Sequence, residues 1–519
     1  MRYKLCINAG LHFIASRQKV RNIMKTVCGI DLGTQSIKVV IYDYEKKEII
    51  EKKSCPLELI SANDGTREQK TEWYDAAMKK CFSELSAGAK ASIEAIGVSG
   101  QQHGFVPLAE DGSALYNIKL WNDTSTTEEC ALITEAAGGK DTVIAATGNL
   151  MLPGFTAPKI LWLKRHKKDA WDKLNYIMLP HDYINWKLTG EYVMEYGDAS
   201  GTAIFDSKNR VWSKKICDAI DAKLEGLLPK LIKPYEKAGV VSTTAAAEYG
   251  IPAGIPVSAG GGDNMMGAIG TGTVCDGFLT MSMGTSGTLY GYSAKPISDP
   301  ENGLSGFCSS SGGWLPLLCT MNCTVATEFI RGLFNLDVKQ LDETAAKAKP
   351  GSDGVIVLPF FNGERTPNLS NGRASITGLT TANTNRENIA RASLESAVFA
   401  MRGGLDAFRK LGFQPKEIRL IGGGSKSATW RQIAADVMNL PIRVPVLDEA
   451  AALGAAVQAL WCLESAKAGK EADMAALCAE HIKIDADKVA MPNPDTVKAY
   501  DAAYAEYNKV LNAVMPLYK

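Results

Sequence analysis

The residues best suited to chemistry in this sequence lie between residues 257 and 272, where one acid follows three glycines. The segment reads VSAGGGDNMMGAIGTG, and its acid is Asp263. Glycines carry no side chain, so they let a backbone come close to a ligand. Asp263 is therefore either a solvated residue in a glycine-rich turn or a general base at the floor of a cleft. The second interpretation requires phosphate-holding groups elsewhere in the chain.

Two glycine turns, each between two strand-like runs, could hold such phosphates. Residues 26–43 contain the turn 33–36, and Asp31 comes just before it. Backbone N–H groups and hydroxyls in such a turn can bind a phosphate, while a carboxylate beside it can orient a hydrated Mg²⁺. A partial repeat follows at residues 279–290, with the turn at 284–287. This repeat predicts two related halves that each give a phosphate loop to a shared cleft.

A polar turn follows a short apolar strand that we expect at residues 95–98. The turn contains Gln102 and His103, one of five histidines in the chain. Both side chains donate and accept hydrogen bonds, as binding a polyol requires, although a structural histidine in a loop fits the same residues. Polar and aromatic clusters at residues 121–123 and 154–159 could extend a sugar site or could be packed loops.

The second half contains a strand, a glycine turn and a helix in succession. Residues 417–424 read EIRLIGGG, and an apolar stripe from Trp430 to Met438 has helical spacing. This order is compatible with a nucleotide, because the turn lets the backbone approach a ligand at the helix N-terminus. The segment is neither GxxxxGK[ST] nor GxGxxG, so Lys426 is not assigned the role of a P-loop lysine.

Three local patterns complete the second half. Thr384 and Glu387 predict a capping box before a long helix that ends near Phe408. The sequence FFNGERTP at residues 360–367, taken by itself, indicates a Glu–Arg pair that fixes a loop. Residues 449–454, EAAALG, open a helix of small residues that could pack against the nucleotide turn.

Composition narrows the class of protein. The 519 residues include 57 Lys+Arg and 57 Asp+Glu, which does not favour a nucleic-acid partner, and they can bury two or more domain cores. No apolar run approaches the roughly 18 residues of a membrane span. The 12 cysteines are scattered without a CxxC pair, which favours reduced thiols in a cytoplasmic protein. Residues 1–25 are basic and contain no acid, so we expect an upstream start or a disordered extension.

Taken together, these segments resemble the FGGY carbohydrate kinases over residues 27–460. The carriers are GIDLGTQSIKVVIYD, GVSGQQHG, LWND, GNLMLPGFTAPKILWLKRH, GGGDN, SMGTSG, NGERTP and IGGGSKSATWRQIAADV. The resemblance implies an α/β fold with two ribonuclease-H-like domains, of the actin and sugar-kinase ATPase kind, flanking a cleft. It also implies ATP-dependent phosphorylation of a sugar with Mg²⁺. GQxHG, GGGDN and GNLMLPGFTAPK favour D-xylulose over glycerol, ribulose or rhamnulose.

The resemblance assigns roles position by position. Asp263 matches the family's catalytic base, and Asp31 matches the acid near the metal, which it would contact through water. Substrate-binding positions are matched by Gln102, His103, Asp263 and Asn264. Phosphate-binding and adenine-side positions are matched by Thr34, Gln35, Ser36, Gly284, Thr285, Ser286, Gly423 and Gly424.

The sequence departs from the family pattern at three places. Thr124 and Ser125 follow LWND where the family usually has x-Arg, so a charge expected near the sugar entrance is missing. GQMHG becomes GQQHG, and Pro180-His181-Asp182 replaces Pro-Lys-Asp. These changes bear on the choice of sugar and its affinity more than on the reaction.

We therefore expect a kinase that makes D-xylulose 5-phosphate. The alternatives are a kinase for another ketose or polyol of the family, such as ribulose, rhamnulose or glycerol, and a non-enzymatic protein of the actin-like ATPase fold. The expected domains are an N-terminal sugar-kinase domain at 26–268 and a C-terminal, nucleotide-binding domain at 269–519, after the 1–25 extension. The sequence leaves a homodimer open.

Overall fold

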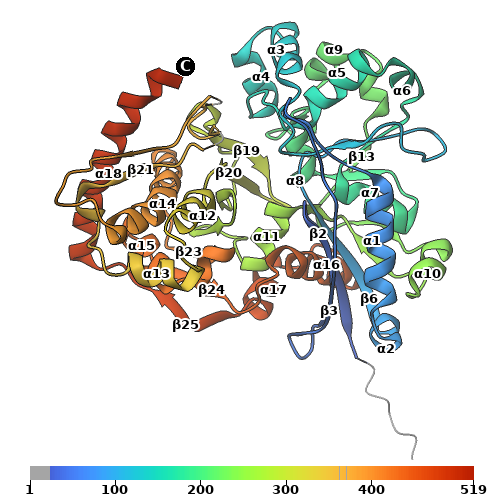
Figure 1. Cartoon of the computed structure of the whole chain (residues 1–519). Helices are drawn as coiled ribbons and strands as arrows, with labels where there is room; N and C mark the ends of the chain where they lie inside the picture. The colour runs from blue at the N-terminus through green and yellow to red at the C-terminus, as the bar shows by residue number, and fades with distance from the viewer. Residues whose placement is uncertain (1–23, 362, 370, 519) are drawn as a thin grey trace, which may run out of the picture.

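The computed structural model describes residues 24–361, 363–369 and 371–518. Most of the extension expected at residues 1–25 thus lies outside the described residues. The described chain forms two lobes, each built on a seven-stranded sheet (Figure 1). This is the mixed α/β, two-domain architecture that the sequence predicts.

The first sheet contains the first predicted phosphate hairpin. Its order is β14-β15-β6-β1-β2-β3, with the short strand β16 beside β6. The predicted hairpin is confirmed, because β1 pairs antiparallel with β2 while β6 lies parallel to β1 on its other side. The strands are β1 (Thr26–Leu32), β2 (Ser36–Asp43), β3 (Glu48–Pro56), β6 (Ile93–Gly100), β14 (Lys237–Val240), β15 (Pro256–Ser258) and β16 (Gly261–Gly262).

The second sheet repeats this local arrangement, in the order β19-β20-β18-β17-β23-β24-β25. Here β17 pairs antiparallel with β18 and parallel with β23, as β1 does with β2 and β6. The two related halves inferred from the repeated hairpin are therefore present. The strands are β17 (Phe278–Met283), β18 (Gly287–Gly291), β19 (Leu304–Cys308), β20 (Trp314–Thr320), β23 (Glu417–Ile421), β24 (Ile442–Pro445) and β25 (Ile484–Ala490).

Helices and short strands cover the first sheet and extend it at one end. The helical spacing of residues 73–85 is realised in the helix at residues 71–83, whose apolar face packs on the sheet. A separate core joins the segment 105–228 to β19, β20 and the helix after β16. The helices are α1 (Thr71–Ser83), α2 (Ala87–Ala91), α3 (Thr127–Ala136), α4 (Lys140–Thr147), α5 (Thr156–His166), α6 (Lys168–Lys173), α7 (Pro180–Thr189), α8 (Tyr196–Ala199), α9 (Lys214–Ile220) and α10 (Thr243–Tyr249).

Short strands form further small sheets outside the two large ones. They pair as β4–β5–β8, β7–β9, β10–β13, β11–β12 and β21–β22. Their bounds are β4 (Ile60–Ser61), β5 (Arg67–Gln69), β7 (Val106–Leu108), β8 (Ile118–Lys119), β9 (Tyr176–Met178), β10 (Val193–Glu195), β11 (Phe205–Asp206), β12 (Val211–Trp212), β13 (Lys230–Ile232), β21 (Ile356–Leu358) and β22 (Ser375–Thr377).

The second lobe carries the long helix predicted after Thr384, with a corrected start. The N-cap is Asn385, whose side chain accepts from Asn388 N at 2.8 Å, so the predicted Thr384–Glu387 capping box is wrong. The Thr384 hydroxyl instead donates to Thr380 O in the preceding turn. The next residue along the chain therefore caps the helix. The helices are α12 (Thr324–Leu333), α13 (Val338–Ala345), α14 (Arg386–Lys410), α15 (Ala428–Met438), α17 (Met474–His481) and α18 (Pro494–Val514).

Two helices, α11 (Asp263–Thr271) and α16 (Ala450–Ala468), lie between the sheets (Figure 1). They contact each other through backbone: a Cβ on Gly454 would lie 1.8 Å from Met266 O, and one on Gly270 would lie 1.8 Å from Ala450 O. α16 also lies on β1 and β6, where a Cβ on Gly29 would lie 2.0 Å from Ala452 O. Its small residues thus pack mainly on the first sheet and on α11, while Glu449 at its start lines a pocket with the predicted nucleotide turn.

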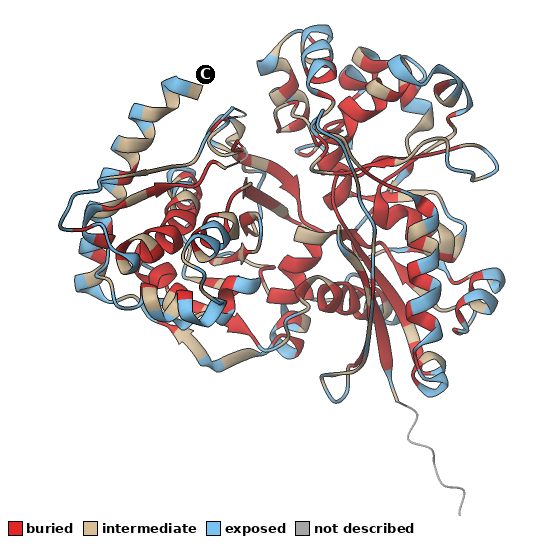
Figure 2. Cartoon of the chain, viewed as in Figure 1, coloured by how far each residue is buried: buried red, intermediate tan, exposed pale blue. Residues whose placement is uncertain are grey.

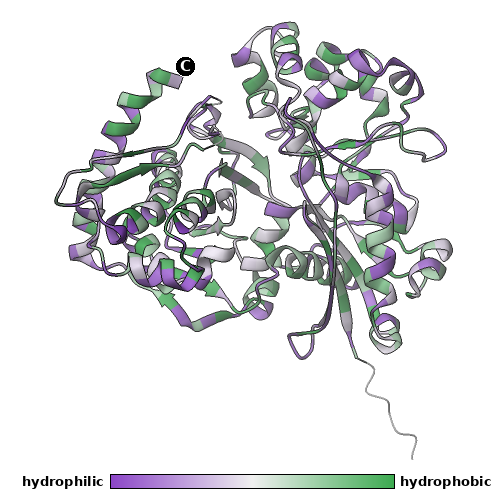
Figure 3. Cartoon of the chain, viewed as in Figure 1, coloured by the Kyte–Doolittle hydropathy of each residue, from purple (hydrophilic) through white to green (hydrophobic). Residues whose placement is uncertain are grey.

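The distribution of buried residues follows the arrangement of the sheets and helices. The strands of both sheets and most of α11 and α16 are buried, whereas the outer helices expose one face (Figure 2). Hydropathy matches this distribution, with apolar strands and outer helices of mixed character (Figure 3). The cysteines among the described residues are free thiols, as expected, and no helix in that part of the chain is long and apolar enough to cross a membrane.

The contact between α11 and α16 leads to a stability prediction. Gly454→Val places side-chain atoms against the backbone of α11, so we expect a loss of at least about 3 kcal/mol of folding free energy, or failure to fold. Thermal unfolding of the purified protein measures the effect. The matched control is Gly332→Ala in α12, where nothing lies within 4 Å, and it should keep or slightly raise Tm. A Gly454→Val protein as stable as wild type would contradict this packing.

Candidate active site

Asp263 begins helix α11, directly after the short strand β16. The strands β1, β6 and β16 end at the same level, because Asp31 pairs with Ser99 and Ser99 pairs with Gly261. Ser99 Oγ donates to Asp31 Oδ1 at 3.0 Å. The fold thus brings the two predicted catalytic acids, 232 positions apart in the sequence, to the same edge of one sheet.

Asn264 fixes the orientation of the Asp263 carboxylate. Its backbone N and its Nδ2 donate to Asp263 Oδ1 at 2.8 and 3.0 Å. Asn264 Nδ2 also donates to Gln102 Oε1 at 2.9 Å. Both bonds to Asp263 reach Oδ1, so Oδ2 is the oxygen that can receive a proton. The predicted grouping of Gln102, Asp263 and Asn264 is therefore present.

Burial and neighbouring carboxylates make Asp263 a stronger base than an ordinary aspartate. Desolvation is the main cause, and the charges of Asp31 and Asp198 add to it, so the pKa of Asp263 rises to about 7 despite the hydrogen bonds from Asn264. Burial also raises the pKa of Asp31, against the opposing effects of Lys38 and Ser99. A general base works best when its pKa lies near the working pH.

The two glycine turns have similar structures. In the first, Gly33 N donates to Ser36 O at 3.0 Å; in the second, Gly284 N donates to Ser286 O at 3.1 Å. Gln35 and Thr285, at the tips, are exposed. The hydroxyl of Thr34 is held from both sides, since it donates to Gln101 Oε1 and accepts from Trp121 Nε1, both at 3.0 Å.

His103 is a buried, neutral acceptor. Its Nδ1 lies 2.6 Å from Gly201 O, and a carbonyl only accepts, so Nδ1 carries the proton and Nε2 is the acceptor. Burial, with Lys159 and Arg365 nearby, holds the pKa of His103 well below its usual value. Lys159 Nζ, itself fully buried, donates to His103 O at 2.6 Å and fixes the turn.

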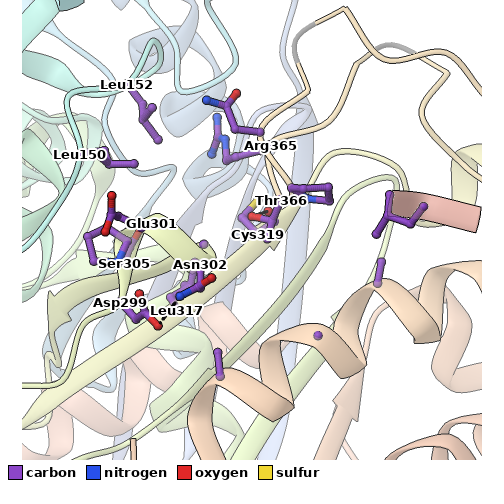
Figure 4. A pocket seen from close by; sticks show the side chains of 18 of the residues that line it. Leu150, Leu152, Asp299, Glu301, Asn302, Ser305, Leu317, Cys319, Arg365 and Thr366 are labelled. Atoms are coloured by element: carbon purple, nitrogen blue, oxygen red, sulfur yellow. Dashed lines mark hydrogen bonds between the residues drawn. The ribbon is translucent and has the colours of Figure 1, made fainter. Parts of the chain in front are cut away.

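A pocket of about 560 Å³ opens beside His103 between the two lobes (Figure 4). Phe155 and Leu152 line it from the first lobe, and Arg365 and Thr366 from the second. Figure 4 shows Leu150 and Leu152 on one side of the view, with Arg365 and Thr366 on a separate segment of the chain. Asp263, Asn264 and Gln102 are not part of the lining, so the pocket meets the predicted sugar residues only at His103.

The predicted adenine-side turn lies at a second, smaller pocket of about 230 Å³. Gly422 has a φ of 84°, and a Cβ there would lie 2.7 Å from Met283 O, at the end of β17. The turn at Gly423 and Gly424 is therefore next to the second glycine turn, which begins at Gly284. Glu449, at the start of α16, lines the same pocket.

Comparison with known proteins decides the family. The model of the FGGY family of carbohydrate kinases, N-terminal domain, matches residues 26–270, and that of its C-terminal domain matches residues 279–463. This chain belongs to the FGGY family of carbohydrate kinases. The expectation drawn from its motifs is confirmed, and the chain is a phosphotransferase of that family.

Individual relatives of this FGGY kinase are similar over nearly their whole length. A xylulose kinase from Haemophilus influenzae is 43% identical over 488 residues, covering 92% of this chain and 98% of that protein. One from Escherichia coli is 35% identical, covering 79% and 84%. A crystal structure of xylulose kinase from Bifidobacterium adolescentis superposes with a TM-score of 0.78 at 30% identity, covering 93% and 99%. A glycerol kinase from Plasmodium falciparum shares the fold, with a TM-score of 0.84 at 24% identity.

The structure adds residues that motif reading missed or assigned otherwise. The Glu364 carboxylate forms no ion pair with the Arg365 guanidinium; it accepts from Met321 N at 2.6 Å, Asn322 Nδ2 at 3.0 Å and the backbone N of Arg365 at 2.7 Å. Arg365 instead lies 5.9 Å from the ring centroid of Trp121, in the other lobe. A cation thus reaches Trp121 from the other lobe, although Thr124 and Ser125 stand where the family usually has x-Arg. Local spacing carries no signal for this contact between lobes.

The acids at the sheet edge fit Mg²⁺ as a partly hydrated ion. Oxygen ligands suit this cation, and a divalent charge would relieve the repulsion by which Asp31 raises the pKa of Asp263. Asp31 would hold it, with Asp263 nearby. Within the described residues no three His, Cys, Asp or Glu side chains converge as a metal site, so phosphate and water would complete the coordination.

The raised pKa of Asp263 predicts a stability gain when this acid is removed. An unfolded aspartate ionises near pH 4, whereas folded Asp263 stays protonated to about pH 7, so its burial costs stability increasingly between these values and fully above them. Asp263→Asn should therefore have a higher Tm than wild type at pH 8, by roughly a few degrees, and little advantage near pH 4.5. Differential scanning calorimetry without ligands measures this. The control Asp276→Asn, at an exposed acid, should give no such pH-dependent gain.

Proposed function

We propose that this FGGY kinase transfers the γ-phosphoryl group of ATP to the terminal primary hydroxyl of D-xylulose. The observation that carries the proposal is Asp263, a base with a pKa of about 7 at the edge of a sheet, with a glycine turn from each lobe available for phosphates. The xylulose kinases that match most of this chain support the choice of sugar. Gln102, His103 and Asn264 supply the amide and imidazole groups that hydroxyls need.

Phosphoryl transfer of this kind depends mainly on alignment and charge stabilisation, because its transition state is loose. In the proposed mechanism Asp263 Oδ2 accepts the proton of the attacking hydroxyl. Asn264 and Gln102 hold the carboxylate and the sugar, and His103 Nε2 accepts a hydrogen bond from a hydroxyl. Mg²⁺, held near Asp31, would neutralise charge on the phosphates of ATP.

Backbone donors complete the proposed site. The turn at Thr34, Gln35 and Ser36 and the turn at Gly284, Thr285 and Ser286 would bind phosphate oxygens, and Gly423 with Gly424 would border the adenine. The start of α11 adds the positive end of a helix dipole where the phosphoryl group would arrive. We place the boundary between the domains 26–268 and 269–519 within α11, so that closure of the lobes would act on Asp263 itself.

Substrate preference tests the proposal directly. With D-xylulose, D-ribulose, L-ribulose, glycerol and L-rhamnulose offered in turn, coupled ADP detection should give kcat/KM at least roughly tenfold higher for D-xylulose than for any other. A preference for another member of the panel would establish the alternative ketose or polyol kinase. ATP hydrolysis at the same rate with and without each sugar would contradict both the D-xylulose kinase and the alternative ketose or polyol kinase.

The role of Asp263 is tested with the same assay. Asp263→Asn keeps the shape of the side chain but cannot accept the proton, so turnover should fall by roughly 10² to 10⁴ while D-xylulose binding, measured by calorimetry, largely survives. Asp276→Asn, the exposed control, should behave as wild type. Near-native turnover of Asp263→Asn would remove this residue from the mechanism.

A further inference from the structure

A buried cluster of charged residues lies behind the sugar-binding residues and takes no part in the proposed chemistry. His181, in α7, has Nδ1 2.7 Å from Asp198 Oδ2 and Nε2 2.9 Å from Asp182 Oδ1. The side chains of His181 and Asp198 are fully buried. Glu195, at the end of β10, is also buried; its carboxylate accepts from Asp198 N at 2.6 Å and from Ser310 Oγ at 2.9 Å.

A carboxylate beside each ring nitrogen favours His181 as an imidazolium. Nδ1 donates to Asp198 Oδ2, whereas Nε2 lies 2.9 Å from Asp182 Oδ1 without hydrogen-bond geometry, so the contact with Asp182 is one of charge. Burial opposes this charge, but Asp182 and Asp198 outweigh it and raise the pKa of His181 well above its ordinary value. The charged groups facing the ring are Asp182 from its own helix, Asp198 from α8 and Glu195 from β10, and the backbone of Gly260, just before β16, also lies against it.

His181 is packed against two glycines in the segments that carry the site, through its backbone at Gly100 and through its ring at Gly260. A Cβ on Gly100 would lie 2.6 Å from His181 N, and one on Gly260 would lie 2.8 Å from His181 Cδ2. Gly100 precedes the Gln102–His103 turn, and Gly260 precedes β16 and Asp263. A shift of His181 would therefore displace both predicted sugar-binding segments.

Asp198 connects the position of His181 to the positions of His103 and Gln102. It lies in α8, and the chain reaches Gly201 three residues later, whose carbonyl fixes the protonated nitrogen of His103. A Cβ on Gly262 would lie 3.0 Å from Asp198 Oδ1 and 2.9 Å from Gln102 Cδ. Within the described part of the chain, Asp198 Oδ1 and Gln102 Nε2 are both buried without a hydrogen-bond partner. The cluster thus borders every segment that would contact the sugar.

We propose that His181 is a positioning residue for the sugar, whose imidazolium joins α7 to α8 and thereby holds His103 and Gln102 in binding geometry. This inference rests on the proposed function. Its consequence is electrostatic: another cation at position 181 can replace the histidine, whereas a neutral side chain leaves Asp182 and Asp198 without their shared counter-charge. The presence of His181 where the family usually has Lys fits this requirement for a cation.

Kinetics of three variants test the proposal. His181→Gln should raise KM for D-xylulose roughly 10- to 100-fold while KM for ATP stays within about twofold, because the nucleotide turns lie elsewhere. His181→Lys should return KM for the sugar to within a few-fold of wild type. The matched control is His166→Gln, which removes a partly exposed histidine that lies 3.2 Å from Glu129 in the same lobe, and it should change neither constant.

The pH dependence separates a charged positioning group from a merely structural one. Since the pKa of His181 is raised, its charge is present below that pKa and is lost as the pH climbs through it. KM for D-xylulose should thus rise on the alkaline side in wild type and stay flat there in His181→Lys. Equal KM values in His181→Gln and wild type, or failure of Lys to rescue, would overturn the proposal.

Nuclear magnetic resonance of ¹⁵N-histidine provides a readout that does not depend on the sugar. His181 should carry protons on both ring nitrogens at pH 8, and the Nδ1–H signal of His103 should shift in His181→Gln but persist in His181→Lys. A neutral His181 at pH 8 would overturn the inference, whereas wild type that phosphorylates no sugar would overturn the proposed function instead. Should His181→Gln fail to fold, Asp198→Asn, which keeps the side-chain shape, should give the same rise in sugar KM.

Discussion

The backbone contact between α11 and α16 is the constraint on which the site depends. Gly270 and Gly454 let the two helices meet without side chains between them, and Gly29 and Gly97 let α16 lie directly on β1 and β6. A close-packed contact of this kind has little freedom to shift, because any added atom must displace backbone. The start of α11 is thereby fixed relative to the first sheet, and Asp263 is fixed relative to Asp31 and to the turn at Gln102.

Several carboxylates lie close together near the start of α11, and their proximity has an electrostatic cost that the surrounding residues reduce. Asp198 is fully buried and Asp31 and Asp263 are half-buried, and desolvation raises the pKa of each. Lys38 offsets part of the charge on Asp31, and His181 does so for Asp198. Asp263 has Asn264 to oppose the shift, and its pKa still rises to about 7. Placing Asp263 here lowers the stability of the folded protein and raises the proton affinity of its carboxylate.

Local patterns in the sequence predicted the parts of this structure that local physics determines. The hairpins at Asp31 and Gly284, the strand before Gln102 and the start of α15 follow from alternating apolar residues and glycine turns. The helix cap at Asn385 was missed by one residue, because Thr384 bonds to the turn before it.

The location of α16, the contact of Arg365 with Trp121 and the charge of His181 depend on segments far apart in the sequence. No local spacing encodes those contacts. The sequence identified His181 only as a departure from the family pattern. Its contacts with two carboxylates could be recognised only in the folded chain. The sequence left Asp263 as either a solvated acid or a general base, and the resemblance favoured the base; the physical reason for its raised pKa, desolvation and neighbouring acids, is visible only in the structure.

Phosphorus-31 nuclear magnetic resonance of the purified protein with D-xylulose, ATP and Mg²⁺ would detect the proposed transfer of a phosphoryl group from ATP to the terminal hydroxyl of a ketose. The γ-phosphate signal should be replaced by one phosphomonoester signal, split by the two protons of C5, with one ADP formed per ester. Release of inorganic phosphate at the same rate with and without D-xylulose, and no sugar ester, would contradict the proposed transfer.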